Sequence, residues 1–324
     1  MPRFPIAGSA DADVEAIRGR AVLVTGATGF IGKHLIQALV AAGAVVHGVA
    51  RVLPARDRAH DGVVWHPGDV TDPLPLQEAV ARAAPACVFH LAAYGTTPLQ
   101  RDAGRMRATN LGGTENVWKA MAGRGARLVQ TGTYAEYGLS SGQLSEDIEC
   151  RPTTDYGRSL HDATSYSRSR AAATGREVVI LRPFATYGPD DRPERLIPHV
   201  ITTLLRGETV DATEGQQRRD YSFVSDQVAA LFAAAARPLT ETGRVYNVGS
   251  GEPIAVRSVV ELVAAAMQAP LAQIRFGGVP SRASDAFDMF ADISRARREL
   301  GFEPRVPLTE GIAQTVAWYR SAPA

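Results

Sequence analysis

The chain has 324 residues, of which 45% are hydrophobic and 21% charged, and this composition is typical of a folded protein with one large and one smaller domain. Lys and Arg number 35 against 34 Asp and Glu, so the net charge of +1 excludes a bulk attraction for nucleic acid or membranes. Cys87 and Cys150 are isolated thiols without metal-ligand spacing, no apolar run reaches membrane-spanning length, and the N-terminus lacks a signal-peptide pattern. We therefore expect a cytoplasmic protein without a metal centre, with residues 1–19 as a mobile arm.

The first strong pattern is a glycine-rich turn. An apolar run at residues 22–24 predicts a buried parallel strand, glycines recur every three residues at Gly26, Gly29 and Gly32, and residues 30–40 have the periodicity of a helix. Glycines let the backbone approach a pyrophosphate, which the free N–H groups of a helix N-terminus favour. The pattern resembles the cofactor fingerprint of the extended short-chain dehydrogenases/reductases, which act on nucleotide sugars.

The residue after the second strand, predicted over residues 44–49, bears on the choice of dinucleotide. A carboxylate there would bind the ribose 2′-OH of NAD, but this chain has Ala50 and then Arg51. Arg51 facing a 2′-phosphate favours NADP(H) over NAD(H), and a solvated loop arginine is the alternative. A third strand over residues 63–66 leads to Asp69, which the resemblance places beside the adenine and which could instead cap the next helix.

Later apolar runs predict the remaining core of the sheet. Strands are expected at residues 86–91, 127–130, 177–181 and 245–251, and helices at residues 196–205, 258–267 and 308–319. His90 lies inside an apolar run, so we interpret it as a core histidine whose hydrogen bonds are satisfied. Together with the resemblance, these elements predict that the cofactor contacts Gly26, Thr28, Gly29, Phe30, Ile31, Gly32, Arg51, Asp69, Val70, Leu91, Ala92, Ala93, Asn110, Tyr156 and Pro183.

The candidate catalytic residues follow the fifth strand. Thr133 lies four residues before Tyr137-Gly138, where the resembled family carries the hydroxyl that binds the substrate oxygen. The family tyrosine then corresponds to Tyr156. A second pair, Tyr166 and Arg170, is disfavoured because its interval to the next strand is too short.

The family lysine four residues after the tyrosine is absent, because position 160 is Leu. Leu160 cannot lower the phenol pKa, so we expect the pKa of Tyr156 to lie near its ordinary value of about 10, with the phenol neutral at pH 7. A neutral phenol donates protons better than it accepts them, which favours carbonyl reduction over alcohol oxidation. Three residues nearby in sequence are candidates to replace the lysine: Arg158, His161 and Arg168.

The residues after Thr133 also bear on the reaction. In the resembled family, nucleotide-sugar 4,6-dehydratases carry an Asp-Glu pair there, whereas this chain has Tyr134-Ala135. Glu136 is displaced by one residue, which turns it to the other face of an extended strand and disfavours dehydration.

The remaining site predictions concern the substrate. The resemblance implies a nucleotide-sugar site at Thr133, Tyr134, Ala185, Arg219, Arg282 and Asp285. Ala185 replaces the usual asparagine, Arg219 and Arg282 would meet the diphosphate, and Asp285 a hydroxyl of the nucleoside. A surface salt bridge is the alternative for Arg219, and Ser225-Asp226 is expected to cap a helix.

We predict an α/β fold: a doubly wound parallel (Rossmann) sheet with a smaller C-terminal substrate-binding domain. The expected division is residues 20–182 for the dinucleotide-binding domain, with residues 219–250 returning to it, and residues 183–320 for the nucleotide-sugar domain. The expected activity is NAD(P)H-dependent reduction of a keto group, at C4, of a nucleotide-linked 4-keto-6-deoxyhexose. The alternatives are a 4-epimerase with tightly bound NAD and a catalytically weakened, cofactor-binding partner of another sugar enzyme. The resemblance also implies a homodimer.

Overall fold

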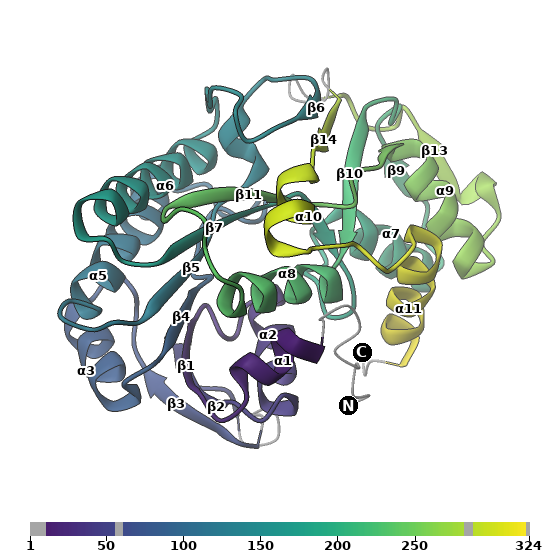
Figure 1. The fold of residues 1–324 in the computed structure, drawn as a ribbon. Helices are drawn as coiled ribbons and strands as arrows, with labels where there is room; N and C mark the ends of the chain where they lie inside the picture. The colour runs from purple at the N-terminus through teal and green to yellow at the C-terminus, as the bar shows by residue number, and fades with distance from the viewer. Residues whose placement is uncertain (1–10, 56–60, 282–287, 322–324) are drawn as a thin grey trace.

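The computed structural model describes residues 11–55, 61–281 and 288–321. Its main feature is a seven-stranded sheet in the order β11-β7-β5-β4-β1-β2-β3, in which every pairing is parallel (Figure 1). Its strands are β1 (Ala21–Thr25), β2 (Val45–Ala50), β3 (Val63–Pro67), β4 (Cys87–His90), β5 (Arg127–Thr131), β7 (Val178–Pro183) and β11 (Arg244–Val248). The strand order reverses between β1 and β4, so the predicted doubly wound sheet is confirmed.

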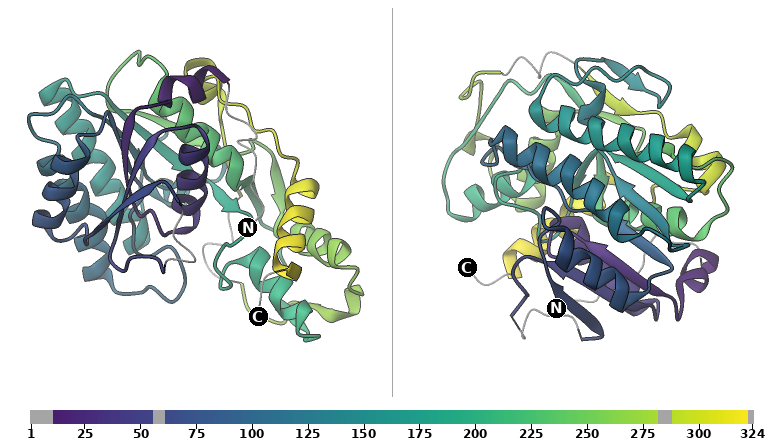
Figure 2. Two further views of the ribbon diagram at one scale, coloured as in Figure 1. Left: turned by 90° about the horizontal axis from the view of Figure 1, so that it is seen from below. Right: turned by 90° about the vertical axis from the view of Figure 1, so that its left-hand side faces the viewer.

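Helices cover both faces of this sheet (Figures 1 and 2). One face packs on α2 (Phe30–Ala41) and α8 (Val224–Ala236), and the other on α3 (Pro73–Ala83), α5 (Gly113–Ala120) and α6 (Asp155–Thr174). The central strands are apolar because both of their faces are buried: Val22, Leu23 and Val24 of β1 have almost no exposed surface. Because the helices cover both faces, the carboxyl ends of the strands form the side of the sheet that is left accessible.

Part of the N-terminal segment that we expected to be a mobile arm forms a helix instead. Residues Asp11–Ile17 form the helix α1, which packs against α8. Ile17 is buried in the core, and the buried carboxylate of Asp13 accepts a hydrogen bond from Arg237 Nε at 3.0 Å. Burial of an apolar side chain and pairing of a charge fix this turn of helix to the domain.

The smaller region lies beside the carboxyl edge of the large sheet (Figure 2). It contains a sheet of β12 (Pro253–Ala255), β10 (Arg218–Phe223), β14 (Met289–Ala291) and β6 (Gly142–Leu144), with β8 (Ala185–Tyr187) paired to β10. A ribbon of β9 (Val210–Ala212) and β13 (Ile274–Phe276) and the helices α7 (Leu196–Leu205), α9 (Val256–Met267) and α11 (Leu308–Ser321) complete its core. The short helix α10 (Ser294–Leu300) packs against β11.

One capping prediction is wrong. Helix α8 begins at Val224 without a side-chain cap, and Asp226 lies inside it. The buried Asp226 carboxylate instead accepts the backbone N–H groups of Arg305 and Val306, both at 3.2 Å. Asp226 therefore fastens the segment before α11 to the large domain. Within the described ranges, no helix combines the length and the apolar character needed to cross a bilayer.

Candidate functional site

The junction of β1 and α2 has room only for glycine at two positions, Gly26 in the turn and Gly32 in the first turn of α2. Gly26 has φ +68°, and a Cβ there would lie 2.7 Å from the backbone N of Ala92. A Cβ at Gly32 would overlap the carbonyl oxygen of Gly26. The N-cap Gly29 offers no side-chain cap, so the first N–H groups of α2 remain available to an anionic ligand.

The turn opens into a cavity of about 770 Å³ at the carboxyl ends of the strands, between the two regions of the molecule. Most of the predicted site residues line it: Gly26, Thr28, Gly29, Phe30, Ile31, Gly32, Arg51, Asp69, Val70, Leu91, Ala92, Ala93, Thr133, Tyr134, Tyr156, Pro183 and Arg219. Asn110 and Ala185 are absent from its wall, and Arg282 and Asp285 lie outside the described residues.

The second strand ends as the sequence indicated. Ala50 is buried, whereas Arg51 is exposed at the rim of the cavity. Asp69 also lies on the wall, and its Oδ1 accepts hydrogen bonds from the backbone N and the Oγ of Thr71, both at 2.9 Å. The cap of α3 is Asp72, which accepts from Leu74 N, so Asp69 does not serve as that cap.

Asn110 supports the site from behind its wall. It is buried in a π-helical segment, Ala108–Gly112, and its side chain bonds the backbone N and O of Tyr94 at 2.8 and 2.9 Å. It also donates to Ser159 Oγ at 2.8 Å, and Ser159 donates to the carbonyl of Tyr156. Asn110 therefore ties the Tyr94 loop to the helix that carries Tyr156. Its predicted direct contact with the cofactor stays a prediction, since Asn110 is absent from the cavity wall and its polar atoms bond within the protein.

Thr133 and Tyr156 meet in the cavity. Thr133 follows β5 and begins the short 3-10 helix η2 (Tyr134–Tyr137), while Tyr156 lies in the first turn of α6. Burial raises the pKa of Tyr156 to about 12, although a hydrogen bond with Thr133 and the charge of Arg195 oppose this rise. The expected pKa of about 10 was therefore too low, because the sequence alone did not show how strongly the protein shields the phenol from solvent. The phenol is neutral at pH 7, as expected.

Leu160 lies one helical turn after Tyr156, is buried and lines the same cavity. A lysine here would face the site, so the aliphatic side chain removes a charge from the cavity itself.

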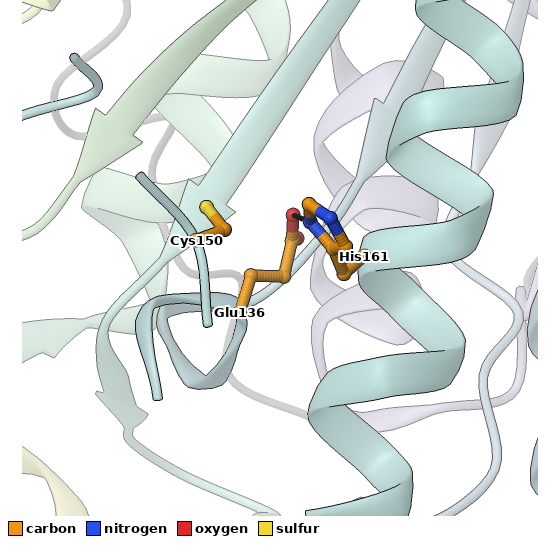
Figure 3. A group of neighbouring side chains, drawn as sticks. All are labelled: Glu136, Cys150 and His161. Carbon is orange, nitrogen blue, oxygen red and sulfur yellow. Dashed lines mark ion pairs between the residues drawn. The ribbon is translucent and has the colours of Figure 1, made fainter. Parts of the chain in front are cut away.

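Behind Thr133, three potential metal ligands lie close together: Glu136, Cys150 and His161 (Figure 3). Glu136 is fully buried, and its Oε1 accepts the Thr133 N–H at 2.9 Å. Its Oε2 accepts Arg182 Nε and Nη2 at 3.1 and 2.8 Å. Because the buried Arg182 guanidinium already neutralises this carboxylate, the cluster is a poor cation site. We interpret Glu136 as a support of Thr133, facing away from the cavity as predicted, although from a 3-10 turn.

Sequence reasoning missed three charged residues that line the cavity: Asp191, Arg192 and Arg195. They follow β8 in a turn that sequence reasoning interpreted only as a link to the next helix. Burial raises the pKa of Asp191 to about 6, against the opposing charges of Arg195 and Arg192. The dense alternation of charges directly after a strand was the available signal.

The comparisons with known proteins agree with this geometry. The model of the NAD dependent epimerase/dehydratase family matches residues 22–249. A dTDP-glucose 4,6-dehydratase of Streptomyces griseus is 32% identical, with 92% of this chain and 93% of that protein covered. A UDP-glucose 4-epimerase of Mycolicibacterium smegmatis is 31% identical, with 92% and 98% covered.

Among solved structures, MoeE5 in complex with UDP-glucuronic acid and NAD is 33% identical. The match covers 92% of this chain and 98% of that one, with a TM-score of 0.83. The glycine turn, the open carboxyl edge and these matches lead to one conclusion. The chain belongs to the NAD dependent epimerase/dehydratase family, the nucleotide-sugar branch of the extended short-chain dehydrogenases that its sequence resembles.

Proposed function

We propose that the protein reduces a keto group, at C4, of a nucleotide-linked 4-keto-6-deoxyhexose with NAD(P)H. The observation that carries the proposal is the pairing of a half-buried, neutral Tyr156 with the buried Leu160 in the same cavity. Carbonyl reduction needs a proton donor at the oxygen, and a phenol without an ammonium neighbour fills that role. Alcohol oxidation needs a base, for which this phenol is poorly suited at neutral pH.

The residues present fit a dinucleotide. The close backbone approach at Gly26 and the uncapped start of α2 suit a pyrophosphate. The cofactor, when bound, supplies a hydride. Arg51 at the end of β2, with no carboxylate at that strand end, supports a preference for the 2′-phosphate of NADP(H).

The chain's own residues hold the other reactant. Thr133 is fixed by Glu136 and presents its hydroxyl beside the phenol of Tyr156, so both groups can hydrogen-bond one carbonyl oxygen. The Tyr156 hydroxyl gives its proton to that oxygen as the carbon is reduced, and Thr133 keeps the oxygen in place. Arg219 at the far wall is positioned to meet a diphosphate.

Two features argue against dehydration, the activity named for several of the relatives. In the resembled family, dehydratases carry an Asp-Glu pair directly after the threonine, whereas this chain has Tyr134 and Ala135 there. Its Glu136 already pairs with Arg182. The chain therefore retains no free carboxylate directly after Thr133.

The direct test measures NADPH oxidation by the purified protein against a panel of nucleotide-linked 4-keto-6-deoxyhexoses. We expect turnover with at least one of them, and a loss of at least roughly 100-fold in kcat for Tyr156→Phe. Interconversion of two 4-epimers without net NADPH use would replace the proposal with the epimerase alternative. Unchanged turnover in Tyr156→Phe would favour the cofactor-binding partner.

A further inference from the structure

The phenol of Tyr156 must carry a negative charge once it has given up its proton, and Leu160 cannot stabilise that charge. Among the described residues, the charged or titratable groups that act on the phenol include Arg195, Tyr134 and Glu136. Glu136 is neutralised by the buried Arg182. Of these groups, Arg195 alone brings a positive charge to the phenol.

The three substitutes that the sequence suggested for the missing lysine do not reach this cavity. Arg158 pairs with Asp155 at the surface, at 2.7 Å. His161 and Arg168 line a second cavity, of about 550 Å³, and are absent from the wall of the first. They lie on α6 itself, but not on the side of the helix that carries Tyr156 and Leu160.

Arg195 comes from the other region of the molecule and is held from two sides. Its Nη2 donates to the carbonyl of Thr186 at 3.2 Å, and its Nε lies 3.2 Å from Asp191 Oδ2. The Asp191 side chain is buried, and its Oδ1 accepts the Arg192 N–H at 2.8 Å. A carboxylate fixed in this way restricts the guanidinium to the wall of the cavity.

We propose that Arg195 is a positioning residue that supplies, from the substrate-side region, the positive charge that Leu160 removes from α6, and that Asp191 holds it in place. This inference rests on the proposed reduction. In that step the hydride adds to the carbonyl carbon, the phenol O–H bond breaks and the proton joins the carbonyl oxygen. The nicotinamide is oxidised, the ketone is reduced to an alcohol, and the negative charge left on the phenol oxygen faces Arg195 until solvent returns a proton.

The kinetic test is a double-mutant cycle. We expect Arg195→Met to lower kcat roughly tenfold with little change in KM. Arg195→Lys should retain most of the wild-type kcat, because the positive charge is needed rather than the two-pronged guanidinium geometry. Adding Leu160→Lys to Arg195→Met should restore kcat, since the ammonium then returns from α6. Arg206→Met, at the exposed far end of α7, is the matched control and should leave kcat unchanged. A rise in KM alone, or no rescue by Leu160→Lys, would overturn the proposal.

A second readout does not depend on turnover. The protein is labelled with 3-fluorotyrosine, whose lower pKa brings the titration into an accessible range, and the Tyr156 signal is assigned by its loss in Tyr156→Phe. Arg195→Met should move the fluorine titration to higher pH, and Arg195→Lys should not. An unchanged titration in Arg195→Met refutes the role of Arg195 even if reduction is confirmed. A shifted titration in a protein without reductase activity leaves the electrostatic role intact and rejects the proposed function.

Discussion

The two ends of the large cavity are built in different ways. At the dinucleotide end, one continuous stretch from β1 to α2 provides the turn, and its geometry requires glycine at Gly26 and Gly32. At the end proposed for proton transfer, Thr133, Tyr156 and Arg195 come from three separate elements. The comparison teaches that the proposed binding of the cofactor depends on local backbone stereochemistry, whereas the proposed proton transfer depends on how distant elements pack.

The largest effect is expected at Glu136, whose carboxylate holds the backbone of Thr133 in place. Glu136→Gln would leave the buried Arg182 guanidinium without a compensating charge and should lower the free energy of unfolding by about 3–5 kcal/mol. Chemical denaturation measures the change. Glu149→Gln, in an exposed pair with Arg151, is the control and should have no measurable effect. Equal stability of the two variants would show that the support of Thr133 is not electrostatic.

Acid should weaken the framework between the two ends. His90 bonds Thr25 Oγ at 2.7 Å and Thr114 Oγ at 3.0 Å, which confirms it as a satisfied core histidine. Burial lowers the pKa of His90 to about 4 from 6.5. Between these two pH values, His90 is protonated in the unfolded chain but not in the folded chain. The free energy of unfolding therefore falls by about 3 kcal/mol as the pH is lowered from 6.5 to 4.

Burial also lowers the pKa of both His47 and His66, which adds to this loss. Burial raises the pKa of Asp191 and Asp226 to about 6, so their contribution has the opposite sign and grows as the pH falls from 6. The His90 contribution is isolated by comparing denaturation of the wild type and His90→Gln across this range. The variant should lose less stability on acidification, and parallel curves would contradict the assignment.

Gly26→Ala tests the local nature of the dinucleotide end. The added Cβ meets both a positive φ and the Ala92 backbone at 2.7 Å, so we expect at least roughly tenfold weaker NADPH binding by fluorescence titration. Gly123→Ala is the matched control, because Gly123 has nearly the same φ, +70°, but nothing within 4 Å of the new Cβ. It should cost about 1 kcal/mol of stability and leave NADPH affinity unchanged. Equal affinity losses would show that backbone strain alone, rather than the close approach, matters.

The smallest effect concerns the choice of cofactor. Arg51→Ala should weaken NADPH binding about tenfold and leave NADH binding unchanged, because only NADPH carries the 2′-phosphate. Arg82→Ala, on the exposed surface of α3, serves as the control. A loss that is equal for both dinucleotides would assign Arg51 to general electrostatic attraction instead.

The sequence by itself determined the parallel sheet and the glycine turn, because apolar runs and glycine stereochemistry act over a few neighbouring residues. The resemblance of the sequence to its family also pointed to Thr133, Tyr156 and the missing charge at Leu160, because the family motifs keep a fixed spacing along the chain. Only the tertiary structure showed that Asn110 bonds Ser159 behind the cavity wall, and that Glu136 is neutralised by Arg182. It alone placed Asp191 and Arg195 on the wall of the cavity that Tyr156 also lines, because that wall forms only when two regions that are separate in sequence pack together.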